Sequence, residues 1–573
     1  MSQSKTNYGA LTVLISVFFF WGFIAAGNSI FIPFCKTYFK LDQFQSLLID
    51  FAFYFAYYIG ALLLFMYGTM RRRDLVGSWG YKNTIVYGLL FSALGAGAMI
   101  ISVYYDQFVG MLFGLFIVAL GFSLQQTAAN PFMIALGDES TGSNRISLGG
   151  GINSLGTTIA PLIVGLILFG STKVTDEMKE NLSLEKVIYL YAFVGMLFLG
   201  VALLFSLSKR LPSGKQEVDE TKNQSEPSTK ALAALLIMTG LLITCFAPVL
   251  NSYRTEESKK VVQLQDHYES LKKHGATTLV LEQKQQEIDV LRKPLEKRRL
   301  WWLGGGLLVV LLGIPLAYGR ARKQKKAWGA MQYPQLSLGM LAIFIYVGVE
   351  VTIGSNLGEL LRQEEFGYEY WEITPFVALF WGSLMVGRWV SAIHVFDLSK
   401  QMKNILTVIV PLVAFSLVLL FSYLAGHQVE HLYPYVICVL ILTAAFHVSQ
   451  NKPALTLMVF GILGAISAMI GVFGSGMLAI YGLMGAGLFC SIMWPCIFSL
   501  SLAGTGVYRT QGSAFLIMMI LGGAIIPPVQ GKLMDIVSAQ HSFLLAVACF
   551  LYIAFFAFYV GKMLKRQGAS LDD

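Results

Sequence analysis

Charged side chains are scarce in this sequence of 573 residues. Only 13% of the residues are Asp, Glu, Lys or Arg, whereas 55% are hydrophobic, and a soluble domain normally carries about 25% charged residues. The charges are also unevenly placed, since 33 of the 75 lie between Lys209 and Lys326. The charged residues in the rest of the chain are too few to cover a surface exposed to water, which excludes a soluble multidomain enzyme and a disordered chain. The sequence therefore predicts a protein whose solvent is lipid.

Cysteine pairing patterns and catalytic motifs are missing as well. The six cysteines contain no C-x-x-C pair and lie within or at the ends of apolar runs, which is typical of small core residues. The glycine-rich segments lack the Lys-Ser/Thr of a phosphate-binding loop, and nothing matches a nucleophile elbow or a metalloprotease motif. The net charge of +9 is concentrated beside apolar runs, where it indicates membrane orientation rather than nucleic acid binding. We therefore expect no enzyme activity, no metal site, no resident cofactor and no nucleic acid partner.

Long apolar runs dominate what is present. A membrane-spanning helix needs about 20 mostly apolar residues, and sixteen runs approach or exceed that length. The first run begins at Ala10 and lacks a signal-peptide cleavage pattern, so we expect it to remain as the first membrane helix. The sixteen runs are 10–34, 46–69, 79–103, 108–137, 145–170, 187–208, 231–250, 300–319, 335–361, 371–396, 404–425, 432–448, 454–472, 475–503, 510–532 and 541–563.

The first and last blocks of runs resemble each other. The order proline, glycine, basic residue, glycine, proline recurs around Arg145 and around Arg509. Two related halves with six core helices each would explain this recurrence. On that interpretation four spans are additional to the core, and each additional pair is a hairpin that leaves the later topology unchanged.

This pattern predicts three regions. Residues 1–208 form an N-terminal six-helix bundle, and 209–330 contain a cytoplasmic linker and two extra spans around a charged insert at 251–299. Residues 331–573 form a C-terminal bundle with an extra helical hairpin at 404–448.

The basic residues predict the orientation of these regions. With the N-terminus in the cytoplasm, Lys and Arg gather in the inside segments, as at 71–73 and 320–326. Both termini are then cytoplasmic, and the 251–299 insert is periplasmic. Apolar residues repeat at helical spacing in the insert on both sides of His274 and Gly275, which predicts a short helical hairpin outside the membrane.

Three ionisable residues within the runs are candidates for function. A charge at the centre of a bilayer costs about 2.5–3.5 kcal/mol, so it usually faces a cavity or a partner. Glu350 lies in the middle of its run and is the best candidate for ion coupling. Asp50 opens the second run, where capping of the helix is the alternative role. Arg388 lies near the inner end of its run, which favours a structural, gating or snorkelling role.

Uncharged polar and aromatic side chains within the runs form a second group. Amides supply hydrogen-bond donors and acceptors together, as a polyhydroxylated ligand requires, although hydrogen bonds between helices are the alternative use. Mid-span tryptophans could stack on the apolar face of a sugar or simply pack in the core. The predicted substrate-binding residues are Asn28, Gln125, Gln126, Asn130, Asn153, Asn356, Trp381 and Trp494.

One polar segment carries a family resemblance. The run from Gln126 to Phe132, Gln-Thr-Ala-Ala-Asn-Pro-Phe, resembles the hallmark of the fucose permease and glucose/galactose transporter branch of the major facilitator superfamily. The segment from Arg71 to Asp74, followed by Gly80, resembles the loop between helices 2 and 3 of the superfamily. Other segments similar to this branch are Phe53-Tyr54-Phe55, Tyr346-Val347-Gly348, Gly387-Arg388 and Trp494-Pro495.

The resemblance implies a fold and a mechanism. The fold is an all-α membrane protein with two pseudo-symmetric six-helix bundles, here with about four extra transmembrane helices, in a bacterial inner membrane. A central monosaccharide site and alternating access driven by ion flow are also implied. The proton-coupled fucose permeases carry acids where this chain has Ser29 and Gln126. Neither side chain titrates usefully, so Glu350 and Asp50 become the candidates for coupling to H⁺ or Na⁺.

These observations lead to a functional hypothesis. We expect a monomeric symporter that imports a neutral monosaccharide such as glucose, galactose or fucose, with Arg71, Asp74 and Arg388 in gating roles. An uncoupled sugar facilitator is the first alternative, because the two family acids are missing. A membrane sugar sensor is the second, because of the four extra spans and the insert.

Overall fold

The helical architecture was described from a computed structural model, which describes residues 6–38, 43–171, 184–215, 227–363, 365–368, 370–450, 452–534, 536–569 and 571. Side chains between residues 25 and 50 lie outside the described part. The described residues contain helices and connecting turns but no strand.

The first block of helices covers the six predicted runs. Gly80, with φ of +83°, separates the short α3 from the next long helix, and Pro131 lies inside α5 without ending it. The helices of this N-terminal half are α1 (Tyr8–Tyr38), α2 (Gln43–Arg71), α3 (Leu75–Trp79), α4 (Tyr81–Tyr104), α5 (Phe108–Ala135), α6 (Gly142–Phe169) and α8 (Leu184–Leu207).

The last block forms the C-terminal half. Two of its predicted spans are each broken into two helices, at Ser491–Ile492 and around the 3-10 turn η6 (Met519–Leu521). The helices are α12 (Pro334–Leu361), α13 (Tyr370–Ala392), α14 (Lys400–Leu424), α15 (Val436–Ser449), α16 (Pro453–Phe473), α17 (Gly476–Cys490), α18 (Met493–Leu502), α19 (Arg509–Met518), α20 (Gly522–Met534) and α21 (Leu544–Arg566).

The all-α membrane fold predicted from composition is confirmed. Fourteen helices of the described part are long and apolar enough to cross a membrane. The helices α1 and α6, of 31 and 28 residues, cover the first and fifth predicted runs. Each predicted run therefore lies on one helix or on two consecutive helices.

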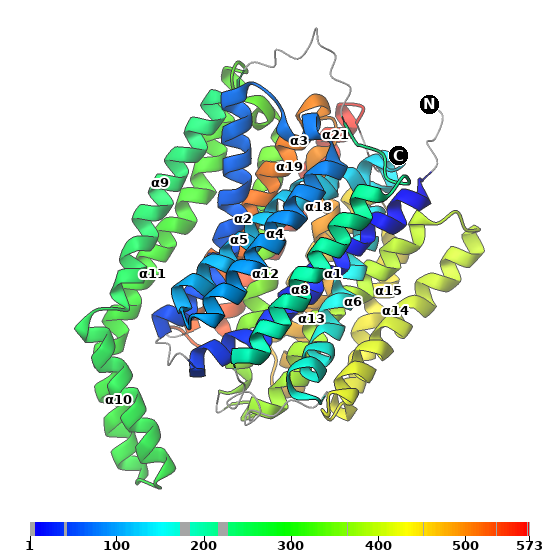
Figure 1. The fold of residues 1–573 in the computed structure, drawn as a ribbon. Coiled ribbons are helices and arrows are strands. Elements are labelled where there is room, and N and C mark those ends of the chain that lie inside the picture. The colour runs from blue at the N-terminus through cyan, green and yellow to red at the C-terminus, as the bar shows by residue number, and fades with distance from the viewer. Residues whose placement is uncertain are drawn as a thin grey trace.

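The two halves meet along two lines of contact. On one side α2 of the N-terminal half packs against α19 and α20, and on the other side α6 packs against α13. The additional helix α9 (Thr229–Ser252) lies beside α2, and α11 (Thr278–Lys323) lies beside α9 and against α12 and α20. At the opposite edge α14 lies beside α13 and α6, and α15 lies beside α14 (Figure 1). The two additional pairs thus flank the two sides of the interface.

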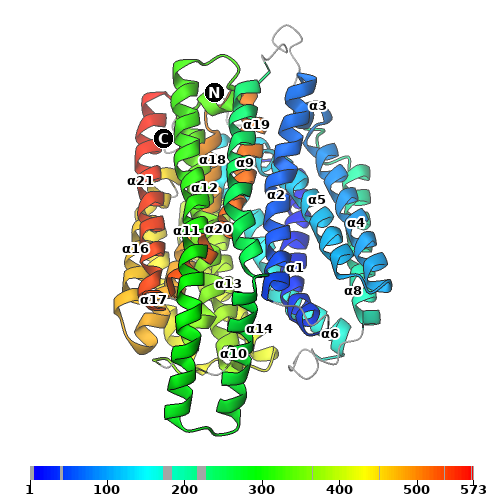
Figure 2. The same ribbon diagram turned by 90° about the vertical axis from the view of Figure 1, so that its left-hand side faces the viewer.

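The charged insert forms a helical hairpin. Helix α10 (Glu256–Lys273) packs against the first part of α11 through Val261, Ile288 and Leu295, which are almost fully buried. The second arm differs from the expectation of a separate hairpin and span, because α11 runs without a break for 46 residues. The hairpin projects beyond the bundle at the end opposite to the start of α1 and the end of α21 (Figure 2).

The hairpin core predicts the effect of a single truncation. Ile288→Ala removes the most buried side chain of this small core, at a cost of about 2 kcal/mol or more. Hydrogen exchange of the amides of 256–299 should therefore accelerate by about 30-fold. Val290→Ala, at a position 73% exposed on the same helix, is the control and should leave the exchange unchanged. Equal exchange in the two variants would show that this core does not hold the hairpin together.

Candidate functional site

Arg388 joins the two halves of the protein. Its Nη2 lies 3.5 Å from Oε1 of Glu350 on α12, and its Nη1 donates to Ser154 Oγ on α6 at 2.8 Å. Its Nε donates to the backbone oxygen of Ser491, between α17 and α18, at 3.1 Å. Because charges inside a membrane protein need partners within the protein, this one guanidinium couples three C-terminal helices to α6.

The hydroxyl of Tyr346 contacts the carboxylate of this ion pair, and further aromatic rings lie next to Tyr346. Tyr346 lies one turn before Glu350 on α12 and donates its hydroxyl to Glu350 Oε1 at 2.9 Å. The ring of Trp494 lies 6.3 Å from the Tyr346 ring and stacks on Phe498 at 5.8 Å. Side-chain exposure of Glu350 and Arg388 is only 12% and 11%, so the pair is largely shielded.

Glycines on α6 allow Arg388 to reach across the interface. A Cβ on Gly150 would lie 3.2 Å from Arg388 Cδ, and a Cβ on Gly151 would lie 2.5 Å from the Trp389 ring. Any larger residue at 151 would push α6 away from α13. Gly150 and Gly151 are therefore points of close approach between α6 and the opposite half.

A second polar group lies on α2 and α5 of the N-terminal half. Gln126 Nε2 donates to the hydroxyl of Tyr57 at 3.1 Å, and Asn130 Nδ2 donates to the backbone oxygen of Gln126 at 3.0 Å. Gln126 is half-buried, whereas Asn130 is 2% exposed. Gln126 is therefore more exposed than Asn130 on this face.

Gln125 packs within the N-terminal half. Gln125 is fully buried, and its side chain accepts from Trp21 Nε1 at 2.7 Å and donates to Ser92 Oγ at 3.1 Å. Asn153 donates to the backbone oxygen of Phe18 on α1 at 3.1 Å. In this conformation both side chains connect helices within one half, which is the alternative use considered for such amides.

Two further predicted residues pack within the C-terminal half. Asn356 on α12 donates to the backbone oxygen of Pro527 at 3.3 Å and to Gln530 Oε1, both on α20. The Trp381 ring would lie 2.5 Å from a Cβ at Gly354, so it packs α13 closely against α12. Asn28 and Asp50 lie on α1 and α2, but their side chains are outside the described residues.

Further contacts join the halves at the end that carries the start of α1. Asp74, which precedes α3, accepts a hydrogen bond from Thr510 at the start of α19. Arg509 forms an ion pair with Glu139, and Asn144 Nδ2 donates to the backbone oxygen of Ser391 at 2.9 Å. Neutral Thr510 and Asn144 carried no sequence signal for this role, because their partners are distant in the chain.

The electrostatics of this end depend on Asp74. Burial raises the pKa of the Asp74 carboxyl, and the hydrogen bond from Thr510 opposes that rise. Arg71, predicted to gate with Asp74, is exposed at the end of α2 and lies over the Tyr67 ring at 5.4 Å. The structure thus places Asp74 in the contact between the halves and Arg71 beside it on the surface.

The described residues hold no group of three His, Cys, Asp or Glu side chains that could bind a metal ion. A cavity of about 480 Å³ is lined by Tyr8, Leu11 and Phe396 among others, at the edge between α1 and the segment after α13. Its lining contains none of the predicted binding residues.

The chain is similar to known proteins over nearly its whole length. A glucose/galactose transporter of Brucella abortus biovar 1 (strain 9-941) is 28% identical, over 97% of this chain and 95% of the relative. The L-fucose-proton symporter of Escherichia coli (strain K12) is 24% identical, over 97% and 94%. The crystal structure of the E. coli fucose:proton symporter shares the fold, with a TM-score of 0.60 at 20% identity over 97% and 99% of the two chains.

The family assignment follows from a match to a family as a whole. The model of the family described as Major Facilitator Superfamily matches residues 10–457, well over half of the chain. The two halves, their contacts through α2, α6, α13 and α19, and the fold of the fucose:proton symporter agree with that match. The chain is a multi-pass membrane protein that belongs to the Major Facilitator Superfamily, a family of transporters.

Proposed function

We propose that the chain is a secondary active transporter that imports a neutral monosaccharide of the glucose, galactose or fucose type by symport with H⁺ or Na⁺. The names of the relatives, a glucose/galactose transporter and an L-fucose-proton symporter, support the class of substrate. The observation that carries the coupling is the shielded pair of Glu350 and Arg388 at the interface between the halves.

The proposed substrate site uses polar groups of the N-terminal half and aromatic groups of the C-terminal half. Gln126 and Tyr57 supply donors and acceptors for sugar hydroxyls from the N-terminal half. Trp494, beside Tyr346, supplies an aromatic face for the apolar side of the ring from the C-terminal half. Asn28, Asn130, Asn153, Asn356 and Trp381 remain candidates in the other conformation of the cycle.

Coupling follows from the shared partners of Arg388. A proton or Na⁺ on Glu350 neutralises the charge that holds the guanidinium. Because the same guanidinium donates to Ser154 on α6, loss of the ion pair weakens a contact between the halves. Ion binding thus favours separation of α6 from α13, the helices that Arg388 and Ser154 join, and this separation is a route to alternating access. Asp50 is the second candidate for the ion.

The orientation proposed from basic residues agrees with the ends of the helices. Basic residues occupy the last turns of three helices: Arg71 in α2, Arg320, Arg322 and Lys323 in α11, and Lys565 and Arg566 in α21. The start of α1 and the end of α21 lie at one end of the bundle (Figure 1). We propose that this end is cytoplasmic and that the membrane is a bacterial inner membrane.

Two alternatives make different predictions for transport. An uncoupled facilitator would exchange sugar in proteoliposomes but would ignore imposed H⁺ and Na⁺ gradients. A membrane sugar sensor would bind sugar without net accumulation. A panel of competing sugars, measured under separate pH and sodium gradients, distinguishes all three.

The first prediction concerns Glu350. Glu350→Gln removes the ionisable group but keeps its size, so ion-driven accumulation should fall to the equilibrium level while sugar exchange persists. Uptake of labelled sugar into proteoliposomes, with and without an ion gradient, measures both. Glu359→Gln on the same helix, at a side chain 61% exposed, is the matched control and should accumulate sugar normally. Undiminished accumulation in Glu350→Gln would mean that another group carries the ion.

A further prediction concerns the pH dependence of the contact between Asp74 and Thr510, which we call the gate. The pKa of Asp74 is raised when it is buried against α19, so protonation favours the contact. The contact should be fully present below the ordinary aspartate value of about 3.9 and should weaken as the pH rises through the raised value. The ratio of open to closed gates should change by up to about tenfold per pH unit in that window.

Spin labels at the exposed positions Met70 and Val507, one on each half, can measure this ratio as a distance distribution. Asp74→Asn stays neutral and should remove the pH dependence. Asp106→Asn, at an exposed turn between α4 and α5, should keep it. A pH response that survives in Asp74→Asn would assign the titration to another group.

A further inference from the structure

The additional helices α9 and α11 cover the α2 side of the interface between the halves (Figure 2). Helix α11 packs against α12 and α20 of the C-terminal half, and α9 packs against α2 of the N-terminal half. The pair therefore contacts both of the bodies that must move during transport. We expect the pair to move with the half to which it is more strongly attached.

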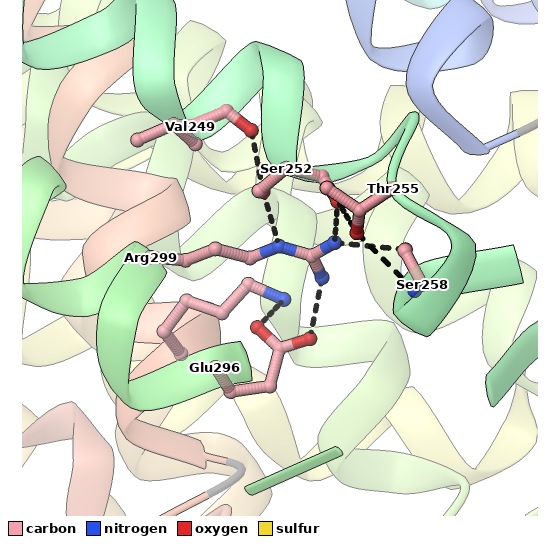
Figure 3. A network of polar contacts seen from close by, with 7 residues as sticks. Val249, Ser252, Thr255, Ser258, Glu296 and Arg299 are labelled. Atoms are coloured by element: carbon pink, nitrogen blue, oxygen red, sulfur yellow. Dashed lines mark hydrogen bonds and ion pairs between the residues drawn. The ribbon is translucent and has the colours of Figure 1, made fainter. Parts of the chain in front are cut away.

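At the hairpin end, a buried charge cluster fastens the pair to the C-terminal half (Figure 3). Glu296 on α11 is 6% exposed, and its two carboxylate oxygens lie 2.7 Å from Arg299 Nη1 and 2.6 Å from Lys532 Nζ on α20. Arg299 Nε also donates to Ser252 Oγ at the end of α9, at 2.8 Å. Removal of one member of such a cluster leaves a buried charge incompletely paired, which is costly.

At the other end, Gln511 of α19 fastens the same pair. Its Oε1 accepts from the backbone nitrogen of Ala330, just after α11, at 2.6 Å. Its Nε2 donates to Ser228 Oγ, which precedes α9, at 3.0 Å. Gly329 has a φ of +50°, and a Cβ there would lie 2.3 Å from Gln511 Oε1. The pair is thus attached to the C-terminal half at both ends.

The pair of α9 and α11 contacts the N-terminal half through uncharged side chains. The hydroxyls of Tyr58 on α2 and Thr239 on α9 lie 2.9 Å apart. Thr239 donates to the backbone oxygen of Leu235 at 2.7 Å, so Tyr58 is the donor in this bond. The rings of Phe51 and Phe246 meet nearby at 5.9 Å. Among the described side chains, the polar and aromatic contacts of this joint are uncharged, and such contacts break and reform more readily than a buried charge cluster.

We propose that α9 and α11 move as one body with the C-terminal half and that the Tyr58–Thr239 bond is a latch that stabilises the conformation described here. A hydrogen bond of this length is lost when the two atoms separate by about 1 Å, so rocking of the halves breaks it. The proposal rests on the alternating access proposed above, in which the two halves move relative to each other. The extra spans then tune the conformational equilibrium without touching the sugar.

The test measures the open and closed populations with spin labels at Met70 and Val507, in a chain without its six native cysteines and reconstituted in nanodiscs. Thr239→Val keeps the side-chain shape and removes the acceptor. It should raise the ratio of open to closed protein by about threefold, the average worth of a hydrogen bond between membrane helices. Tyr58→Phe removes the donor and should produce the same shift.

Thr244→Val is the matched control. Thr244 is an exposed residue on the same helix, and its hydroxyl bonds to Gly240 of α9 itself, at 2.8 Å. This variant should leave the ratio unchanged. An equal shift in Thr244→Val and Thr239→Val would assign the effect to helix α9 in general and would overturn the latch.

The attachment to the C-terminal half is tested in a double-variant cycle. Lys532→Met releases α20 from Glu296 but leaves the Glu296–Arg299 pair in place. In that background the pair is held to the C-terminal half by Gln511 at its other end, so Thr239→Val should change the ratio by clearly less than threefold. Lys532→Arg keeps the cation and should restore the full threefold effect.

The outcomes separate the latch from the proposed function. If the unmodified chain shows one label distance with and without D-glucose, D-galactose or L-fucose, rocking fails and the latch fails with it. If two distances occur and Thr239→Val leaves their ratio unchanged, the latch alone is wrong. If Thr239→Val shifts the ratio equally in the Lys532→Met background, the Glu296–Lys532 ion pair is not what attaches α9 and α11 to the C-terminal half.

Discussion

A charge that is buried in a membrane protein must find its partner inside the protein, and the arrangement of the two halves depends on this constraint. Glu350 and Arg388 meet at a distance of 3.5 Å with about one tenth of each side chain exposed. The C-terminal half supplies both charges, from α12 and α13, and the N-terminal half adds the hydroxyl of Ser154 on α6 as a further partner of Arg388. The bond to Ser154 therefore both satisfies Arg388 and joins the two halves.

The coupling that we propose uses this arrangement. A stable core would satisfy Arg388 with partners from one helix bundle, and an ion would then change little at the interface. Here the partners belong to both bundles, so a change of charge at Glu350 alters the contact between them. The additional helices follow the same logic, with buried charges at Glu296 and Lys532 for a permanent joint and a neutral bond at Thr239 for a contact that must break.

Much of the architecture was predictable because the lipid solvent leaves a strong pattern in the sequence. The long apolar runs, the linker at 209–229 and the helical spacing within the insert each depend on residues close in the chain. The family resemblance at 126–132 was confirmed, and Glu350 proved to be a buried carboxylate with a cation beside it. The continuity of α11 was missed, because the polar and apolar parts of one helix look like separate elements when only composition is considered.

The sequence by itself determined the solvent, the number of helical runs and the family, since these depend on local composition and short motifs. Only the tertiary structure separated amides that pack, such as Gln125 against Trp21, from Gln126, which keeps a partly exposed face. It alone paired Arg388 with Ser154, 234 residues away, and Asp74 with Thr510, 436 residues away. The physical reason is that a hydrogen bond depends on the direction in which a side chain points, and on a buried helix that direction is set by neighbours from distant parts of the chain.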